Sequence, residues 1–79
     1  MTKEQQDRTD RIAARCGRYD ANEGHGQREA WHICEESDRL GIVDARGMID
    51  ISGEVARRFK TSYVTAYRRE LATIPAGVG

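Results

Sequence analysis

The stretch that most constrains the fold is residues 52–71, because it holds two helix-start signals ten residues apart. Ser52 can cap a first helix, since its hydroxyl can accept a backbone N–H left unpaired at the start, and Glu54 follows where the helix dipole favours a negative charge. A second start comes at Thr61 and Ser62. Apolar side chains then recur at helical spacing along the first segment: Ile51, Val55, Ala56 and Phe59. The stretch predicts two short helices separated by a turn at Lys60–Ser62.

The segment after Ser62 has an apolar side and a basic side. The apolar stripe contains Tyr63, Ala66, Tyr67, Leu71 and Ile74, and the other side carries Val64, Thr65, Arg68 and Arg69. The small residue Ala56 would let the two helix axes approach. These features suit a helix-turn-helix, in which the second helix enters the DNA major groove.

The same stretch resembles the helix-turn-helix of resolvase/invertase DNA-binding domains and of many small phage, plasmid and bacterial regulators. The likeness is carried by Glu54-Val55-Ala56-Arg57-Arg58-Phe59, Ser62 and Thr65-Ala66-Tyr67-Arg68, within about 20 of the 79 residues. Two positions depart from the family, Lys60 replacing a turn glycine and Thr61 replacing Val or Ile. The resemblance implies that the groove-facing residues are Ser62, Tyr63, Val64, Tyr67 and Arg68, with Thr65 and Arg69 near the DNA backbone.

Helical spacing and the resemblance place two tyrosines differently. Spacing puts the rings of Tyr63 and Tyr67 on the buried side, whereas the resemblance puts them at the DNA, and a tyrosine can pack its ring while its hydroxyl reaches outward. We expect Tyr67 to contact a phosphate and leave Tyr63 undecided. Arg68 is the best candidate for a two-pronged hydrogen bond to guanine, and Val64 can contact a thymine methyl group. The expected phosphate contacts of the first helix are Arg57 or Arg58 and Lys60.

Length and composition favour one small domain that works with a second copy. The 79 residues leave too little interior for an enzyme cleft together with a regulatory domain, so we expect neither catalysis nor a cofactor. The hydrophobic content of 38% and mean hydropathy of −0.75 predict a homodimer or cooperative assembly. The first residues are polar and no apolar run could span a bilayer, which favours a cytoplasmic protein.

The formal charge of zero hides an asymmetry. Residues 1–40 carry seven basic and nine acidic side chains, whereas residues 41–79 carry six and four. Residues 52–71 alone carry five and two, a net of +3. Positive charge is therefore concentrated on the proposed reading unit, as expected if one end of the molecule meets phosphate.

The remaining segments complete an all-α prediction: a three-helix helix-turn-helix core, an additional N-terminal helix and no wing. Residues 1–19 form a helix capped by Thr2 and ending near Arg15, or else a basic arm that enters the minor groove. The arginines of that alternative arm are Arg8, Arg11, Arg15 and Arg18. Residues 20–26 form a linker and residues 27–74 the helix-turn-helix domain, whose first helix spans residues 27–40 and stops at Gly41. Residues 44–50 form one helical turn, and residues 75–79 a flexible tail.

Metal and nucleophile chemistry is not expected. The four possible zinc ligands are Cys16, His25, His32 and Cys34, but His32 and Cys34 are two residues apart on a helix and point in different directions. No oxyanion pocket can be named for either cysteine, and a reducing compartment would keep both as thiols.

The sequence therefore predicts sequence-specific binding of double-stranded DNA, in the first place by a small transcriptional regulator. A recombination or excision accessory and a phage packaging DNA-recognition protein remain open alternatives. A protein-interaction module, such as a phage-type inhibitor or adaptor, is a further alternative that would use the acidic first half, including Glu35, Glu36 and Asp38.

Overall fold

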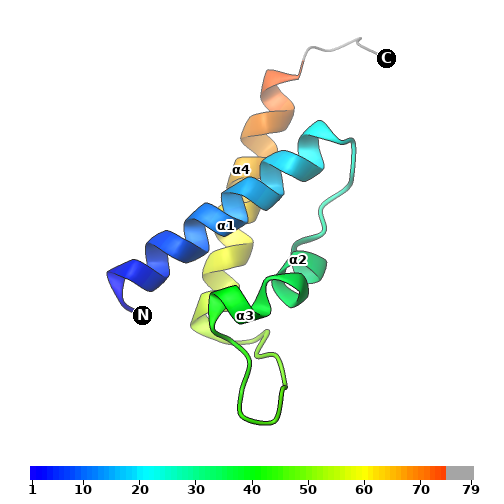
Figure 1. Ribbon diagram of the computed structural model, residues 1–79. Helices are drawn as coiled ribbons and strands as arrows, with labels where there is room; N and C mark the ends of the chain where they lie inside the picture. The colour runs from blue at the N-terminus through cyan, green and yellow to red at the C-terminus, as the bar shows by residue number, and fades with distance from the viewer. Residues whose placement is uncertain (75–79) are drawn as a thin grey trace.

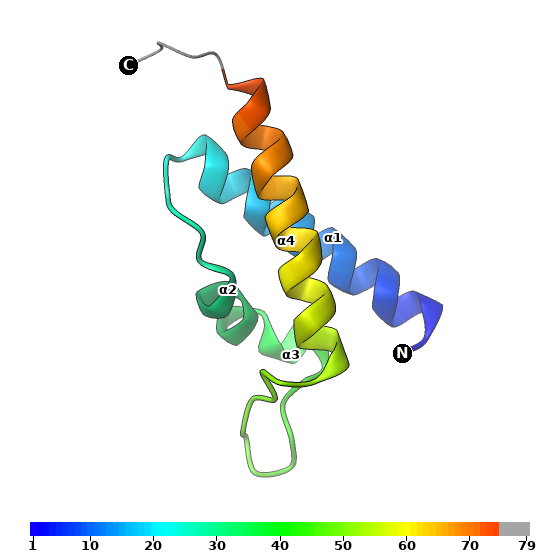
Figure 2. The same cartoon turned by 180° about the vertical axis from the view of Figure 1, so that it is seen from behind.

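The computed structural model of the chain describes residues 1–74 and consists of two long helices that cross, with two short helices beside them (Figures 1 and 2). The helices are α1 (Lys3–Asn22), α2 (Glu29–Glu35), α3 (Ser37–Leu40) and α4 (Glu54–Thr73). The all-α prediction is confirmed. Among residues 1–74, no helix combines the length and apolar composition needed to cross a bilayer. The predicted tail, residues 75–79 with Pro75, lies outside the described residues.

Helix α1 begins as predicted but extends further. The Thr2 hydroxyl accepts the backbone N–H of Gln5, and the Gln5 side chain accepts the N–H of Thr2, a reciprocal cap. The helix then runs past the predicted end at Arg15 and takes in the first three residues of the predicted linker. It continues because its inner side stays small or apolar, and this side packs against α4. The small or apolar buried residues of that side are Ile12, Ala13, Cys16, Gly17 and Ala21, and the polar residues Thr9 and Asp20 are buried there too.

At Gly17 the backbone of α1 lies close to the backbone of α4. A Cβ added at Gly17 would lie 2.6 Å from the Tyr63 carbonyl oxygen and 3.0 Å from the Tyr67 backbone nitrogen. Only glycine allows the two backbones to come this close. Gly17 therefore sets the separation of the two long helices.

The predicted turn at Lys60–Ser62 is wrong, since α4 is one uninterrupted helix. No glycine or proline occurs between Glu54 and Thr73 to break it. The hydroxyls that suggested a second helix start have other partners: Thr61 Oγ1 donates to the Arg57 carbonyl at 3.2 Å, and Ser62 Oγ to Asp10 Oδ1 at 2.7 Å. Such bonds let serine and threonine sit inside a helix. The chain thus lacks the helix-turn-helix that was predicted at this place.

The segment between α1 and α4 also differs from expectation in two places. The predicted helix of residues 27–40 is interrupted at Glu36, giving α2 and α3. Its predicted stop is confirmed, because Gly41 is left-handed with φ 70° and the Ile42 N–H bonds the Ser37 carbonyl at 3.2 Å. The helical turn predicted for residues 44–50 is wrong.

Residues 41–53 instead form a loop that projects from the body of the molecule (Figure 2). Asp44 Oδ1 accepts the N–H groups of Arg46 and Met48 at 2.8 and 3.0 Å, which turns the chain, and one antiparallel bridge pairs Val43 with Ile49. The predicted Ser52 cap is also wrong: Gly53 is the N-cap of α4, and the Ser52 hydroxyl donates to Asp50.

A small core lies where α1, α4 and the α2–α3 segment meet. Phe59, Tyr63 and Tyr67 stack along the inner side of α4, with ring centroids 6.4 and 6.0 Å apart. Ile12 of α1, Ile33 of α2 and Leu40 of α3 close around these rings. The buried side that helical spacing predicted for both tyrosines is confirmed.

Candidate functional site

The ten residues predicted to contact DNA divide into two groups. The side chains that reach solvent are Arg57, Lys60, Thr65, Arg68 and Arg69. Those that are buried, half-buried or held by other parts of the chain are Arg58, Ser62, Tyr63, Val64 and Tyr67. The second group is placed by contacts with α1, with the 23–28 connection and with the core.

Arg58 and Ser62 are held by Asp10 of α1, and we call these three residues the Asp10 cluster. Arg58 Nε and Nη2 donate to the two Asp10 carboxylate oxygens at 2.9 and 2.8 Å, and Ser62 also bonds Asp10. These bonds, led by that of Arg58, lower the pKa of Asp10 below its ordinary value of 3.8. Arg58 and Ser62 therefore serve the contact between the two long helices.

Tyr63 belongs to a second, buried group around Asp20, which we call the Asp20 cluster. Tyr63 donates a short hydrogen bond to Asp20 Oδ2, and His32 Nε2 lies 2.8 Å from the same oxygen. Arg28 donates to Asp20 Oδ1 at 3.2 Å from Nε and 2.6 Å from Nη2, and its backbone N–H donates to the Tyr63 hydroxyl at 2.9 Å. Asp20 and Tyr63 are both 0% exposed.

The electrostatics of the Asp20 cluster favour a charged carboxylate. Burial opposes ionisation of Asp20, but the hydrogen bonds from Arg28, Tyr63 and His32 outweigh it and lower the pKa of Asp20 to about 2. Burial, followed by the bond to Asp20, raises the pKa of Tyr63. No buried side-chain nitrogen or oxygen of residues 1–74 lacks a partner. The cluster thus ties α2 to both long helices and leaves no buried polar group free for a ligand.

Tyr67 also turns inward. Its hydroxyl donates to the His25 carbonyl at 2.8 Å, and its side chain is 8% exposed. The phosphate contact expected of Tyr67 therefore has no free hydroxyl proton in this structure.

The outward side of α4 keeps the basic character expected of it. Arg57 and Arg68 are eleven residues apart, three turns, and so point in nearly the same direction. Lys60 lies to one side of them and Arg69 to the other, beside Thr65. Within residues 1–74 none of these four basic side chains forms an ion pair.

Helix α1 carries a second set of exposed cations, the arginine row, composed of Arg8, Arg11, Arg15 and Arg18. Their spacing of three, four and three residues puts them on one side of the helix, along about 15 Å. No ion pair involves them in the described part of the chain. The row lies on an ordered helix, where the sequence had left a basic arm open.

One hollow joins the two basic helices, and we call it the α1–α4 groove. It has a volume of about 500 Å³ and a floor that includes Ala14 and Ala66. Arg18 and Asp10 line it from α1, and Arg69, Glu70 and Thr65 line it from α4. The end of the arginine row and the basic side of α4 therefore meet along one groove.

Negative charge gathers in the remaining part of the molecule. Residues 29–53 carry six acidic and two basic side chains, whereas α4 carries two and five. The two basic residues of the acidic segment are Arg39, which pairs with Glu36 at 3.3 Å, and Arg46. The fold thus separates the charges more sharply than the two halves of the sequence do.

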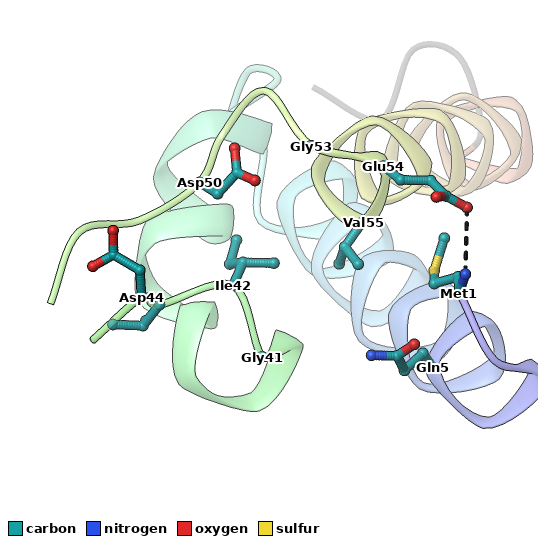
Figure 3. Close-up of a pocket in the computed structure, with 10 residues that line it drawn as sticks. Met1, Gln5, Gly41, Ile42, Asp44, Asp50, Gly53, Glu54 and Val55 are labelled. Carbon is teal, nitrogen blue, oxygen red and sulfur yellow. Dashed lines mark ion pairs between the residues drawn. The ribbon is translucent and has the colours of Figure 1, made fainter. Parts of the chain in front are cut away.

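A further hollow lies between the start of α1, the 41–53 loop and the start of α4 (Figure 3). Ile42 and Val55 face its interior, and the amino group of Met1 lies 3.7 Å from Oε1 of Glu54. The carboxylates of Asp44 and Asp50 lie on the loop, where each accepts loop N–H groups. Nowhere in residues 1–74 do three potential metal ligands of the His, Cys, Asp or Glu type cluster together.

The two cysteines differ in environment. Burial, with a smaller effect of Glu36, raises the pKa of the Cys16 thiol to about 11, whereas Cys34 is exposed on α2. Cys16 is therefore a core side chain, and Cys34 is the accessible thiol of the chain.

Sequence reasoning missed the residues that hold the fold: Asp10, Gly17, Asp20, Arg28 and His32. A signal for Asp20 was present, because Ala13, Gly17 and Ala21 continue the inner side of α1 past Arg15 at intervals of four. Following that repeat would have placed Asp20 at a buried helical position.

Comparisons with known proteins add no relative: no family model, no curated protein and no solved structure matches this chain.

Proposed function

We propose that the protein binds double-stranded DNA through the outward side of α4 and the adjoining α1–α4 groove. The observation that carries this proposal is that two packed helices expose arginines without ion-pair partners among residues 1–74, and the groove between them is lined by Arg18 and Arg69. Arginine is suited to phosphate and to guanine, because its planar fork can donate two parallel hydrogen bonds.

In this arrangement α4 lies in the major groove, which at about 12 Å is wide enough for a helix. Arg68 stands on the outward side, where it can donate to guanine. Arg69 and Arg18 contact the DNA backbone along one edge of the major groove. The rest of the arginine row continues this positive surface along α1. Lys60 faces the other edge of the major groove, and Arg57 points toward the DNA on the same side of α4 as Arg68, about three turns away.

A duplex fits this surface better than a single strand. Proteins that hold single strands stack successive bases on exposed aromatic rings. Tyr63 and Tyr67 are buried, and Tyr19 is the exposed aromatic residue of α1. On α4 the basic side therefore offers phosphate contacts without an exposed aromatic ring for base stacking, which favours duplex DNA.

Binding of a labelled random-sequence duplex, measured by fluorescence anisotropy over a salt series, tests the proposal. Arg18→Ala and Arg69→Ala should each weaken binding and reduce the slope of log affinity against log salt by about 0.9, since each would remove one phosphate contact. Arg46→Ala is the matched control, because it removes an exposed arginine from the acidic segment. Equal losses for Arg46→Ala and Arg69→Ala would contradict a defined surface.

Selection of bound sequences from a random duplex library tests base reading. Arg68→Ala should cost about 1–3 kcal/mol on the selected site and relax the preference at one base pair. The same loss on every sequence would instead make Arg68 a phosphate contact.

A second candidate function, a protein-interaction module, is favoured by exposed apolar residues near the acidic segment. Trp31 is 52%, Met48 65% and Ile51 66% exposed. A library selection that enriches no sequence, together with a stable complex with another protein, would favour this function over DNA binding.

A further inference from the structure

A hollow separate from the α1–α4 groove lies between α2 and α4, and we call it the α2–α4 hollow. It has a volume of about 350 Å³. Its lining is mostly apolar or small and comprises Ala30, Ile33, Cys34, Ile51 and Ala56, together with the charged residues Glu29, Arg57 and Lys60. Ile51 stands at its edge with two thirds of its surface in water, although an isoleucine gains free energy when it is covered.

The charges around the hollow are divided between its two sides. Glu29 belongs to α2, while Arg57 and Lys60 belong to α4. Within residues 1–74 none of the three has an ion-pair partner. An apolar centre with an acid on one side and bases on the other is complementary to its own copy turned by a half rotation.

We infer that a second copy of this chain docks on the α2–α4 hollow, forming a dimer with two-fold symmetry. In such an interface each contact occurs twice, so Glu29 of one copy faces Lys60 of the other, and the reverse. The Ile51 side chains at the edge of each hollow are covered by the contact. A different protein would need its own matching acid and base, whereas a second copy supplies both.

This dimer does not depend on DNA binding, and it would contain two α4 helices, one from each copy. Of the residues proposed to contact DNA, Arg57 and Lys60 line the hollow and would be covered in the dimer, whereas Arg68, Arg69 and the arginine row lie outside its lining. A protein that dimerises but binds no duplex would uphold this inference and overturn the proposed function. A monomer that binds duplex would do the opposite.

Charge reversal in two separate chains gives the sharpest test. In Glu29→Lys the new ammonium group faces Lys60 of the other copy, and in Lys60→Glu the new carboxylate faces Glu29. Each variant alone should therefore dimerise at least about tenfold more weakly than the wild type. Mixed together, the two variants restore both opposite-charge contacts and should form a heterodimer.

Sedimentation velocity in reducing buffer, with one variant labelled at its amino terminus, measures the outcome. Labelled Glu29→Lys should sediment as a monomer alone and as a dimer after Lys60→Glu is added. Ile51→Asp should also give a monomer, and Arg46→Ala, outside the hollow, should leave the dimer unchanged. Circular dichroism of each variant checks that the helices are retained.

Alkylation of Cys34 provides a second measurement. Its reaction with iodoacetamide should slow as the protein concentration rises, because the second copy covers the hollow, and Ile51→Asp should abolish that dependence. Cys16 is an internal reference, since it is buried. A wild-type protein that stays monomeric, with Cys34 equally reactive at every concentration, would overturn the inference and leave the hollow to another partner. Failure of the two charge variants to associate when mixed would overturn the Glu29–Lys60 pairing.

Discussion

Two aspartates of α1, ten residues apart, accept similar hydrogen bonds, but one is partly exposed and the other is buried. Asp10 and Asp20 each bind an arginine through Nε and Nη2 and a hydroxyl of α4. The Asp10 and Arg58 side chains are each 39% exposed, whereas the Asp20 side chain is fully buried. Water reaches both partners of the Asp10–Arg58 pair, whereas in the Asp20–Arg28 pair it reaches the arginine, 32% exposed, but not the carboxylate, so the two pairs should contribute differently to stability.

The largest effect should come from removing the buried carboxylate. Asp20→Ala leaves Arg28, Tyr63 and His32 without their shared acceptor, and breaking a buried charged pair typically costs about 3–5 kcal/mol. That is a large fraction of the stability expected of a domain of this size, about 4–12 kcal/mol, so the melting temperature should fall strongly. The helical signal in circular dichroism measures this. Tyr63→Phe keeps the ring but removes one hydrogen bond to Asp20, so this variant should remain folded with a lower melting temperature. An Asp20→Ala variant as stable as the wild type would remove the contrast with Asp10.

A smaller effect should appear in the pH dependence of stability. The pKa of Asp20 is lowered from 3.8 to about 2, so its contribution is fully present above 3.8 and is lost as the pH falls toward 2. The shift corresponds to about 2 kcal/mol in the free energy of unfolding. Urea titrations at pH 5 and pH 2 measure this loss. Asp10→Asn should lose nearly as much stability between pH 5 and pH 2 as the wild type does. If its stability did not change with pH, the acid sensitivity would belong to Asp10 and not to Asp20.

The smallest effect should be that of the exposed pair. A double-mutant cycle with Asp10→Ala and Arg58→Ala should give a coupling energy of about 1 kcal/mol or less, and added salt should reduce it. Urea melts of the four proteins measure it. A coupling above about 2 kcal/mol would place the Asp10 cluster with the buried one.

The sequence allowed the all-α class, the cap at Thr2, the stop at Gly41 and the burial of the Tyr63 and Tyr67 rings to be predicted, whereas Leu71 and Ile74 of the same predicted stripe are exposed. The confirmed predictions follow from short-range spacing and capping, which act within a few residues. The turn at Lys60–Ser62 failed for the opposite reason. Ser62 looks like a cap from its neighbours, and only the presence of Asp10, fifty-two residues earlier in the chain, shows why its hydroxyl can stay inside a helix.

The candidate site shows the same limit. Arg57, Lys60, Thr65, Arg68 and Arg69 were predicted on the outer side of α4 and are exposed there. Arg58 could not be told apart from Arg57 by composition, since only the position of α1 decides which of the two finds a carboxylate. The juxtaposition of Arg18 with Arg69 likewise depends on where two distant helices cross.

The place where α1 and α4 cross depends on Gly17, whose side chain is a single hydrogen atom. Arg18 follows Gly17 directly, so whatever holds Gly17 against the backbone of α4 also fixes how far Arg18 stands from Arg69. A methyl group at position 17 would wedge the long helices apart and widen the spacing of the two guanidinium groups. The width of the α1–α4 groove is thus set by Gly17, a residue without a side chain that could contact a ligand.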